Sequence, residues 1–270
     1  MKIAFIGGGN MAQALLTGLK TQQFVMSDIT VVELNDDKCH DLQQKFGVMT
    51  TRKLADASLC KTILFAIKPQ QLPALAKSLA PTLDNQLIIS IAAGIRLKDL
   101  SLWLNHYQTI VRAMPNTPAQ IQTGVTGLYA LPKVSKTQIS MADKILSAAG
   151  STLWLDSEDK LDAVTAISGS GPAYVFYFIE ALQEAALTLG LNEADAKQLS
   201  IATFKGASLL ADVSDTPVTK LREQVTSKGG TTEQGLISLE NSKVKDAIVL
   251  AAKKAYERAK TLGDELSKMN

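Results

Sequence analysis

Short apolar runs alternate with amphipathic stretches over the first 160 residues, and this pattern predicts alternating strands and helices. The predicted helices cover residues 10–20, 36–46, 70–79, 96–105 and 135–149. The apolar runs between them are the predicted strands: Ile3–Ile6, Ile29–Glu33, Thr62–Ala66, Leu87–Ile91, Thr109–Met114, Gly124–Ala130 and Thr152–Leu155. Such alternation is typical of an α/β fold with a mostly parallel, doubly wound sheet of the Rossmann type.

Strand signals end near residue 160, and the rest of the chain has only helical patterns. The predicted helices are 172–189, 192–213, a short one opening at Thr216-Pro217, 231–240 and 243–267. We therefore expect an α/β domain over residues 1–160 and an all-α domain over 161–270. Helix 172–189 is apolar on almost every side, so it requires burial against more than one neighbour. A dimer interface and a monomeric core both satisfy that requirement.

A glycine-rich turn follows the first predicted strand. Gly7, Gly9 and Ala12 have the spacing of a dinucleotide-binding turn. Gly7 permits the tight turn, Gly9 allows the backbone to approach a pyrophosphate, and Ala12 lets the next helix pack closely. The N-terminal amides of that helix favour negative charge. Because Glu33 also ends the second strand, as the pattern requires, we expect a bound dinucleotide here.

Further candidate residues follow other strands, because ligands of open α/β sheets lie past the carboxyl ends of the strands. Lys68 can pair with a phosphate or donate near the nicotinamide ring, unless it is a solvated surface lysine. Asn116 can orient the coenzyme amide or only cap its own turn. Two hydroxyl-rich segments, 168–172 and 227–232, precede predicted helices. Amides and hydroxyls at helix starts bind carboxylates, although ordinary capping explains either segment alone.

Composition excludes several classes of protein. The chain has 270 residues, 46% of them hydrophobic, and a formal net charge of +2, so we expect neither a nucleic-acid nor a membrane partner. The pattern starts at residue 2, and we expect a cytoplasmic protein without a targeting peptide. The cysteines (Cys39, Cys60) and histidines (His40, His106) lack the spacing of metal ligands, so no metal is expected.

The predicted helical domain contains no histidine and no cysteine. Carbonyl reduction usually requires a strong acid or base at the oxygen, whereas an imine nitrogen is basic enough to carry its own proton. Hydroxyls and amides alone therefore favour imine reduction, although Lys228 or Lys68 could serve as the acid.

Several segments resemble the pyrroline-5-carboxylate reductase family, in matching order and over nearly the whole chain. They are Phe5–Met11, Ala66–Pro69, Ser90–Gly94, Val111–Pro118, Ser168–Tyr174 and Val225–Thr232. The resemblance implies that hydride passes from NADPH or NADH to the C=N carbon of 1-pyrroline-5-carboxylate and forms L-proline. It also implies a homodimer built through the helical domain, with a decamer of dimers as a larger alternative.

The resemblance, together with the pattern above, indicates three sets of site residues. The coenzyme would contact Ile6, Gly7, Gly8, Gly9, Asn10, Met11, Glu33, Asn35, Lys53, Ala66, Ile67, Lys68, Pro69, Ala92, Ala93, Gly94 and Asn116. The substrate would contact Val225, Ser227, Gly230, Thr231, Thr232 and Ser170. The candidate catalytic residues are Thr232, Ser227 and Lys68.

The chain departs from its relatives at two positions. Lys228 stands where relatives often carry proline, which makes the substrate bend less rigid. Glu33 stands where relatives that favour NADPH tend to have small, hydroxyl or basic residues. A carboxylate there binds ribose hydroxyls and repels a 2′-phosphate, unless Arg52 or Lys53 compensates, so we expect NADH to be used at least as well as NADPH.

Two other functions fit parts of the pattern. A β-hydroxyacid dehydrogenase needs a catalytic lysine in the first long helix of its helical domain, and residues 172–189 contain none. A non-catalytic dinucleotide sensor could dispense with segment 227–232, which is intact here.

Overall fold

The computed structural model describes residues 2–268, which form two compact units. The first unit comprises the residues up to Ser170 together with those from Ala255 onward, and the second is Gly171–Lys254. The last helix therefore contributes its first part to the second unit and its last part to the first.

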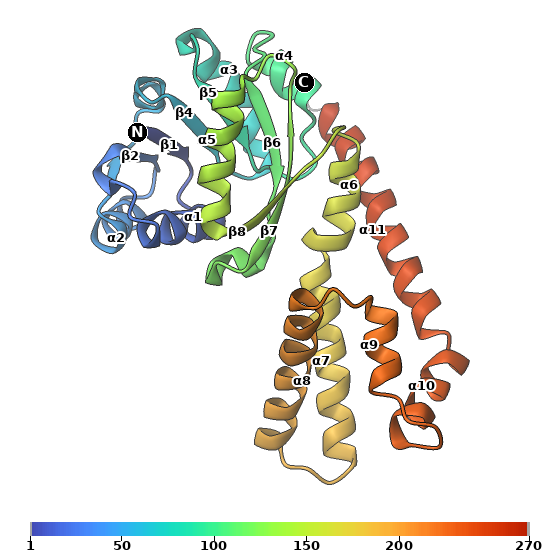
Figure 1. Cartoon of the computed structure of the whole chain (residues 1–270). Helices are drawn as coiled ribbons and strands as arrows, with labels where there is room; N and C mark the ends of the chain where they lie inside the picture. The colour runs from blue at the N-terminus through green and yellow to red at the C-terminus, as the bar shows by residue number, and fades with distance from the viewer. Residues whose placement is uncertain (1, 269–270) are drawn as a thin grey trace. The chain divides into compact units, whose positions relative to one another are not determined.

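The first unit is built on an eight-stranded sheet in the order β3-β2-β1-β4-β5-β6-β7-β8 (Figure 1). Neighbouring strands are parallel except β6 and β7, which are antiparallel. The strands are β1 Ile3–Ile6, β2 Ile29–Val32, β3 Met49–Thr51, β4 Thr62–Phe65, β5 Leu87–Ser90, β6 Ile110–Met114, β7 Gly124–Ala130 and β8 Gly150–Trp154. Because β2 and β4 flank β1 on opposite sides, the carboxyl end of β1 is a topological switch point, where open α/β sheets bind their ligands.

Helices cover both faces of this sheet (Figure 1). They are α1 Asn10–Thr21, α2 Asp36–Phe46, α3 Leu72–Leu79, α4 Leu97–Trp103, α5 Lys136–Leu146 and α6 Lys160–Val164. Side chains alternate along each strand, so Ile3 and Phe5 join one apolar core with α1, α2 and α5. Ala4 and Ile6 join the other core with α3 and α4, and Leu266 packs into the same core. The predicted doubly wound α/β fold is confirmed.

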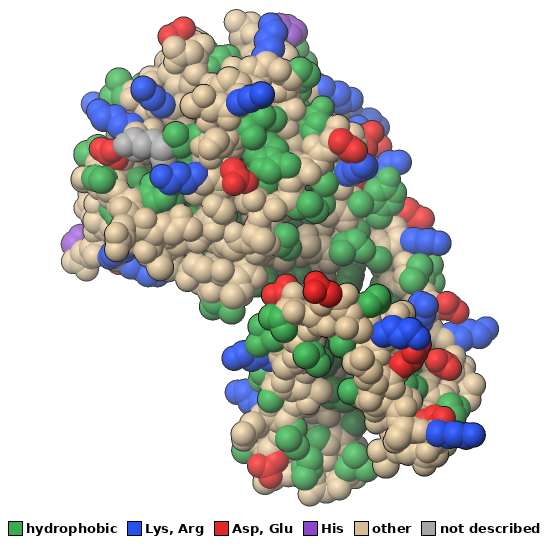
Figure 2. Space-filling view, viewed as in Figure 1, with side chains coloured by type: hydrophobic (Ala, Val, Ile, Leu, Met, Phe, Trp, Pro, Cys, Tyr) green, Lys and Arg blue, Asp and Glu red, His purple; other side chains and the backbone are tan. Residues whose placement is uncertain are grey.

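The second unit is all-α, as predicted. Its helices are α7 Gly171–Thr188, α8 Glu193–Val213, α9 Val218–Gln224, α10 Thr231–Asn241 and the first part of α11 Val244–Ser267. Large apolar side chains lie at its surface (Figure 2): Phe176 is 64% exposed and Leu210 is 54% exposed. An apolar groove of about 540 Å³ opens between α7 and α11, and Tyr177 and Ile248 help to line it. So much exposed apolar surface is typical of a protein–protein interface.

Two short elements were not predicted from the apolar pattern. Strand β3 has only three residues, and none of them is buried, so it carries no hydrophobic signal. The helical turn α6 continues into a π-helical turn, Thr165–Gly169. Other differences are small: helix α5 ends at Leu146, and a 3₁₀ turn completes the segment that was expected to be helical up to residue 149.

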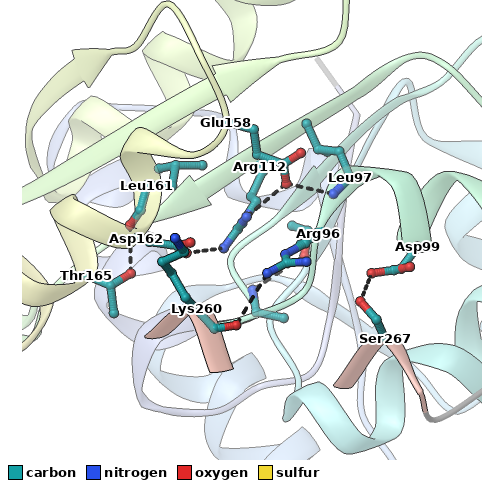
Figure 3. Close-up of polar contacts among 12 residues, drawn as sticks. Arg96, Leu97, Asp99, Arg112, Glu158, Leu161, Asp162, Thr165, Lys260 and Ser267 are labelled. Atoms are coloured by element: carbon teal, nitrogen blue, oxygen red, sulfur yellow. Dashed lines mark hydrogen bonds and ion pairs between the residues drawn. The ribbon is translucent and has the colours of Figure 1, made fainter. Parts of the chain in front are cut away.

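Buried charges hold several elements of the first unit together (Figure 3). Arg112 of β6 is 5% exposed, and it pairs with Glu158 at 2.8 Å and with Asp162 of α6 at 3.6 Å. The same oxygen of Glu158 accepts the N–H of Leu97 at 2.7 Å, at the start of α4. Arg112 therefore joins the sheet to both α4 and α6.

The end of α11 is bound to the segment around α4. Arg96 forms an ion pair with Asp264 at 2.7 Å and donates to the carbonyl of Lys260 at 3.3 Å. Ser267 donates to the carboxylate of Asp99. The contacts of Arg96 with Lys260 and of Asp99 with Ser267 are drawn in Figure 3. Together with the Arg96–Asp264 ion pair, they explain why the last part of α11 belongs to the sheet unit.

Candidate coenzyme and substrate sites

A pocket of about 620 Å³ lies at the carboxyl ends of β1, β2 and β4. Of the predicted coenzyme residues, it brings together Ile6, Gly7, Gly8, Gly9, Glu33, Asn35, Ala66, Ile67 and Lys68. The remaining predicted residues are outside its lining in the described structure: Asn10, Met11, Lys53, Pro69, Ala92, Ala93, Gly94 and Asn116. Arg52, which was considered as a cation that compensates for Glu33, also lines the pocket. The lining residues that were not predicted are Val32, Leu34, Lys38, Leu54, Gln71 and Leu75. Most of these lie on elements next to β2, and only the strand order shows that they share one pocket.

The glycine turn is tight and open on its outer side. Gly7 has φ +98°, and a Cβ there would lie 2.6 Å from the carbonyl oxygen of Ala66. A Cβ at Gly9 would meet no heavy atom within 4 Å, so the backbone at this position faces open space. Helix α1 has Gly9 as its N-cap, without a side-chain cap and without an acid in its first turn. Its first N–H groups are therefore available to a pyrophosphate, and the site fits a dinucleotide.

Glu33 is bound to this turn. One carboxylate oxygen accepts the N–H of Gly8 at 3.1 Å, and the other accepts the N–H groups of Leu34 at 2.9 Å and Asn35 at 3.1 Å. Partial burial alone would raise the pKa of Glu33, but the three N–H donors and the nearby Lys38 ammonium outweigh burial. The net pKa lies below its ordinary value, so this carboxyl is ionised at neutral pH.

Lys68 and Asn116 occupy different surroundings. Lys68 is exposed and lines the pocket, which suits either of its predicted roles. Asn116 is 9% exposed; its amide donates to the carbonyl of Ser168 at 3.0 Å and accepts the N–H of Val125 at 2.9 Å. These bonds hold the turn after β6 against the π-helical turn. A contact between Asn116 and the coenzyme remains a prediction.

The loop after β5 is backed by the end of α11. Gly94 has φ +77°, and a Cβ there would lie 2.9 Å from Leu266 and 3.3 Å from Leu262. A Cβ at Gly263 would in turn lie 3.3 Å from the carbonyl oxygen of Gly94. Close packing against α11 therefore holds the loop that was predicted to face the nicotinamide.

Helix α7 begins within the segment 168–172, at Gly171, but the prediction of free amides there is wrong for Ser170. Its N–H donates to the carbonyl of Thr165 at 2.8 Å, which is the bond of the π-helical turn. The hydroxyl of Ser168 donates to the carbonyl of Val164 at 3.0 Å. The π-helical turn thus follows α6 directly and ends at Gly169, just before α7 begins at Gly171, and such turns are frequent at functional sites. The role of the Ser170 hydroxyl stays a prediction.

The segment 227–232 does form an open bend before α10. Gly229 has φ +73°, and the N–H of Gly230 donates to the carbonyl of Ser227 at 3.0 Å. A Cβ at Gly230 would lie 2.4 Å from the Ser227 hydroxyl oxygen, so a side chain there would displace that hydroxyl. Gly230 is the N-cap of α10 without a side-chain cap, and Ser227, Thr231 and Thr232 are exposed. The first N–H groups of α10 and these hydroxyls together suit a carboxylate.

Residues 2–268 contain neither a cluster of metal ligands nor a membrane-spanning helix. No three histidine, cysteine, aspartate or glutamate side chains come together as metal ligands there. Nor does any helix in this range have the length and apolar character needed to cross a membrane.

A doubly wound sheet, a glycine turn with free amides and an ionised acid after β2 define a dinucleotide-dependent oxidoreductase. Family models give a finer result. "Pyrroline-5-carboxylate reductase dimerisation" matches residues 158–262, and "NADP oxidoreductase coenzyme F420-dependent" matches residues 2–94. A pyrroline-5-carboxylate reductase of Pseudomonas aeruginosa is 39% identical over 267 residues, 98% of each chain. The chain therefore belongs to the pyrroline-5-carboxylate reductase family.

Solved structures agree with this assignment. A pyrroline-5-carboxylate reductase of Coxiella burnetii has a TM-score of 0.93 at 39% identity, over 97% of this chain and 98% of that one. The Plasmodium falciparum pyrroline carboxylate reductase, solved with NADP bound, has a TM-score of 0.86 at 29% identity, over the same shares of the two chains. Both matches extend over the sheet and the helical unit.

Proposed function

We propose that this chain reduces 1-pyrroline-5-carboxylate to L-proline with NADH or NADPH as the reductant. The observation that carries the proposal is the nearly end-to-end similarity to enzymes named for this activity. The coenzyme-sized pocket at the glycine turn and the open bend before α10 supply the two binding functions that the reaction needs.

Each part of the site has a role in this reaction. The N–H groups at the start of α1 bind the pyrophosphate, and Lys68 contacts a phosphate or the ring side of the pocket. The bend of Ser227, Gly230, Thr231 and Thr232, with Val225 before it, binds the substrate carboxylate. Thr232 contacts the ring nitrogen or the carboxylate, and the Ser170 hydroxyl is a further substrate contact.

The reaction does not require a side chain of the enzyme to act as a strong acid or base. The imine nitrogen of the substrate takes up a proton before reduction, so no histidine is needed. Reduced nicotinamide, when bound at the glycine turn, would supply a hydride that adds to the C=N carbon, and the π electron pair of that bond would pass to nitrogen to give the amine of proline. Binding and orientation of the substrate therefore account for most of the catalysis.

The two predicted domains divide this work. Residues 1–160 bind the coenzyme, and residues 161–270 bind the substrate and a second copy of the chain. Exposed apolar side chains of α7 to α11 and the groove between α7 and α11 support a homodimer. A decamer of dimers is the larger assembly to test, by light scattering. The net charge of +2 supports the absence of a nucleic-acid partner, and the two free cysteines, Cys39 and Cys60, fit a reducing, cytoplasmic setting.

A turnover assay tests the proposal. Purified protein mixed with 1-pyrroline-5-carboxylate and either coenzyme should consume the absorbance of reduced nicotinamide and form proline. The variant Thr232→Ala should lower kcat/KM about tenfold or more, since a lost hydrogen bond to a charged group is worth roughly 1.5–3 kcal/mol. Ser238→Ala, an exposed change farther along α10, should leave kcat/KM unchanged.

The same assay separates the alternatives. Oxidation of a β-hydroxyacid with NAD⁺ or NADP⁺ as the hydride acceptor, without reduction of the imine, would favour the dehydrogenase. The lack of lysine in 172–189 already argues against that function. Coenzyme binding without any turnover would favour a sensor. An unchanged kcat/KM for Thr232→Ala would remove Thr232 from the site.

A further inference from the structure

The strongest observation beyond this function concerns the end of the coenzyme pocket that receives adenosine. Glu33, Lys38 and Arg52 line this end of the pocket, where β2 leads into α2. A coenzyme seated on the glycine turn places its adenosine ribose at the end of β2. NADH has a free 2′-hydroxyl there, whereas NADPH has a 2′-phosphate. The charges at this end of the pocket therefore decide which coenzyme fits.

The Glu33 carboxylate is fixed and has one acceptor site left. Of its two oxygens, the one facing Leu34 and Asn35 accepts two N–H groups, whereas the one facing Gly8 accepts a single N–H. A carboxylate oxygen has room for two bonds, so the second oxygen can still accept a ribose hydroxyl. The backbone donors already hold this side chain in place, so binding NADH requires no new ordering of Glu33.

One of the two cations that line this end of the pocket is already paired with a carboxylate. Arg52 is paired with Asp36 through one guanidinium nitrogen, at 2.9 and 3.0 Å from the two carboxylate oxygens. Lys38 acts on Glu33 itself and helps to keep it ionised. Lys53, the other cation expected to compensate, is outside the described lining of the pocket. A 2′-phosphate would therefore add negative charge beside the Glu33 carboxylate, where Arg52 is already engaged with Asp36.

We propose that this chain selects NADH over NADPH, and that the Glu33 carboxylate makes this choice by accepting a ribose hydroxyl and repelling a 2′-phosphate. The inference rests on the proposed coenzyme-dependent function and adds its specificity. Glu33 contacts the coenzyme and takes no part in the chemical step.

Calorimetric titration of the full-length protein with NADH and with NADPH, in the absence of substrate, tests the proposal. At low salt the Kd of NADPH should exceed that of NADH by tenfold or more. The ratio of the NADPH Kd to the NADH Kd should decrease as the salt concentration rises, because salt screens the repulsion between exposed charges. Equal affinities, or tighter binding of NADPH, would overturn the proposal.

Two variants identify the residue responsible. Glu33→Gln removes the charge at nearly constant size, so NADH should bind more weakly, NADPH more tightly, and the Kd ratio should approach one. Asp37→Asn removes an equal charge from an exposed side chain outside the lining, and the ratio should stay at the wild-type value. Equal shifts in the two variants would contradict a specific role for Glu33. If circular dichroism shows that Glu33→Gln does not fold, the ratio of the two Kd values in the wild-type protein, and its dependence on salt, still test the proposal.

The result is separable from the proposed function. Turnover of the imine with a preference for NADPH would overturn the specificity and leave the function intact. Selective binding of NADH without turnover of the imine would overturn the proposed function and leave the coenzyme specificity intact.

Discussion

Replacing Arg112 by methionine is expected to lower the free energy of unfolding by about 3–5 kcal/mol, the range measured when one partner of a buried ion pair is removed. Arg112 is 5% exposed and pairs with two acids, Glu158 at 2.8 Å and Asp162 at 3.6 Å. Methionine keeps most of the volume but leaves both carboxylates without their cation. Because Glu158 also accepts the N–H of Leu97 at the start of α4, loss of Arg112 should weaken the attachment of both α4 and α6 to the sheet. Urea unfolding followed by circular dichroism measures the change.

Lys160→Met is the matched control for Arg112. It also removes a cation from an ion pair, but the side chains of Lys160 and Asp156 are 57% and 74% exposed. Exposed pairs contribute about 0–1 kcal/mol, so this variant should unfold nearly as the wild type does. The double variant Arg112→Met/Glu158→Gln should recover part of the loss, because one orphaned charge is gone. Equal destabilisation by the two single variants would contradict the structural role of Arg112.

Substituting Gly7 by alanine should damage both stability and coenzyme binding. At φ +98° a side chain costs about 1–2 kcal/mol, and overlap of its Cβ with the Ala66 carbonyl oxygen at 2.6 Å adds about 1–3 kcal/mol. Relief of this overlap must move the turn whose amides bind the pyrophosphate. The Kd of NADH should therefore rise tenfold or more, as measured by calorimetric titration.

Gly47→Ala separates the cost of a side chain at positive φ from the effect of steric overlap at the glycine turn. Gly47 also has positive φ, +74°, but a Cβ there meets no heavy atom within 4 Å. This variant should lose only the conformational part of the stability, about 1–2 kcal/mol, and should keep the wild-type Kd for NADH. If Gly7→Ala binds NADH as the wild type does, the glycine turn is not the pyrophosphate site.

Much of the architecture was predictable because the core is regular. The inner strands of the sheet are mostly apolar runs, buried on both faces, and amphipathic helices separate them. The glycine turn was predictable for a different reason, since its backbone geometry admits few residue types. Strand β3 was not predictable, because its three residues are not buried and contribute little to the core. Its pairing with β2 holds it in the sheet.

Other features depend on contacts between distant residues. The π-helical turn takes up the N–H of Ser170, although the small residues around it resemble a helix start. The place of Lys38 and Arg52 in the pocket follows from strand order. Docking of the last turns of α11 on the sheet unit depends on Arg96 and Asp264, which are far apart in the sequence. Neither apolar periodicity nor motif spacing contains this information.

A crystal structure with oxidised coenzyme and L-proline bound tests the central claim most directly, because the claim concerns where each ligand is held. The pyrophosphate should lie on the N–H groups at the start of α1, and the proline carboxylate should lie within hydrogen-bonding distance of the N–H groups of Thr231 and Thr232. Proline bound at another place, with the bend 227–232 empty, would contradict the account.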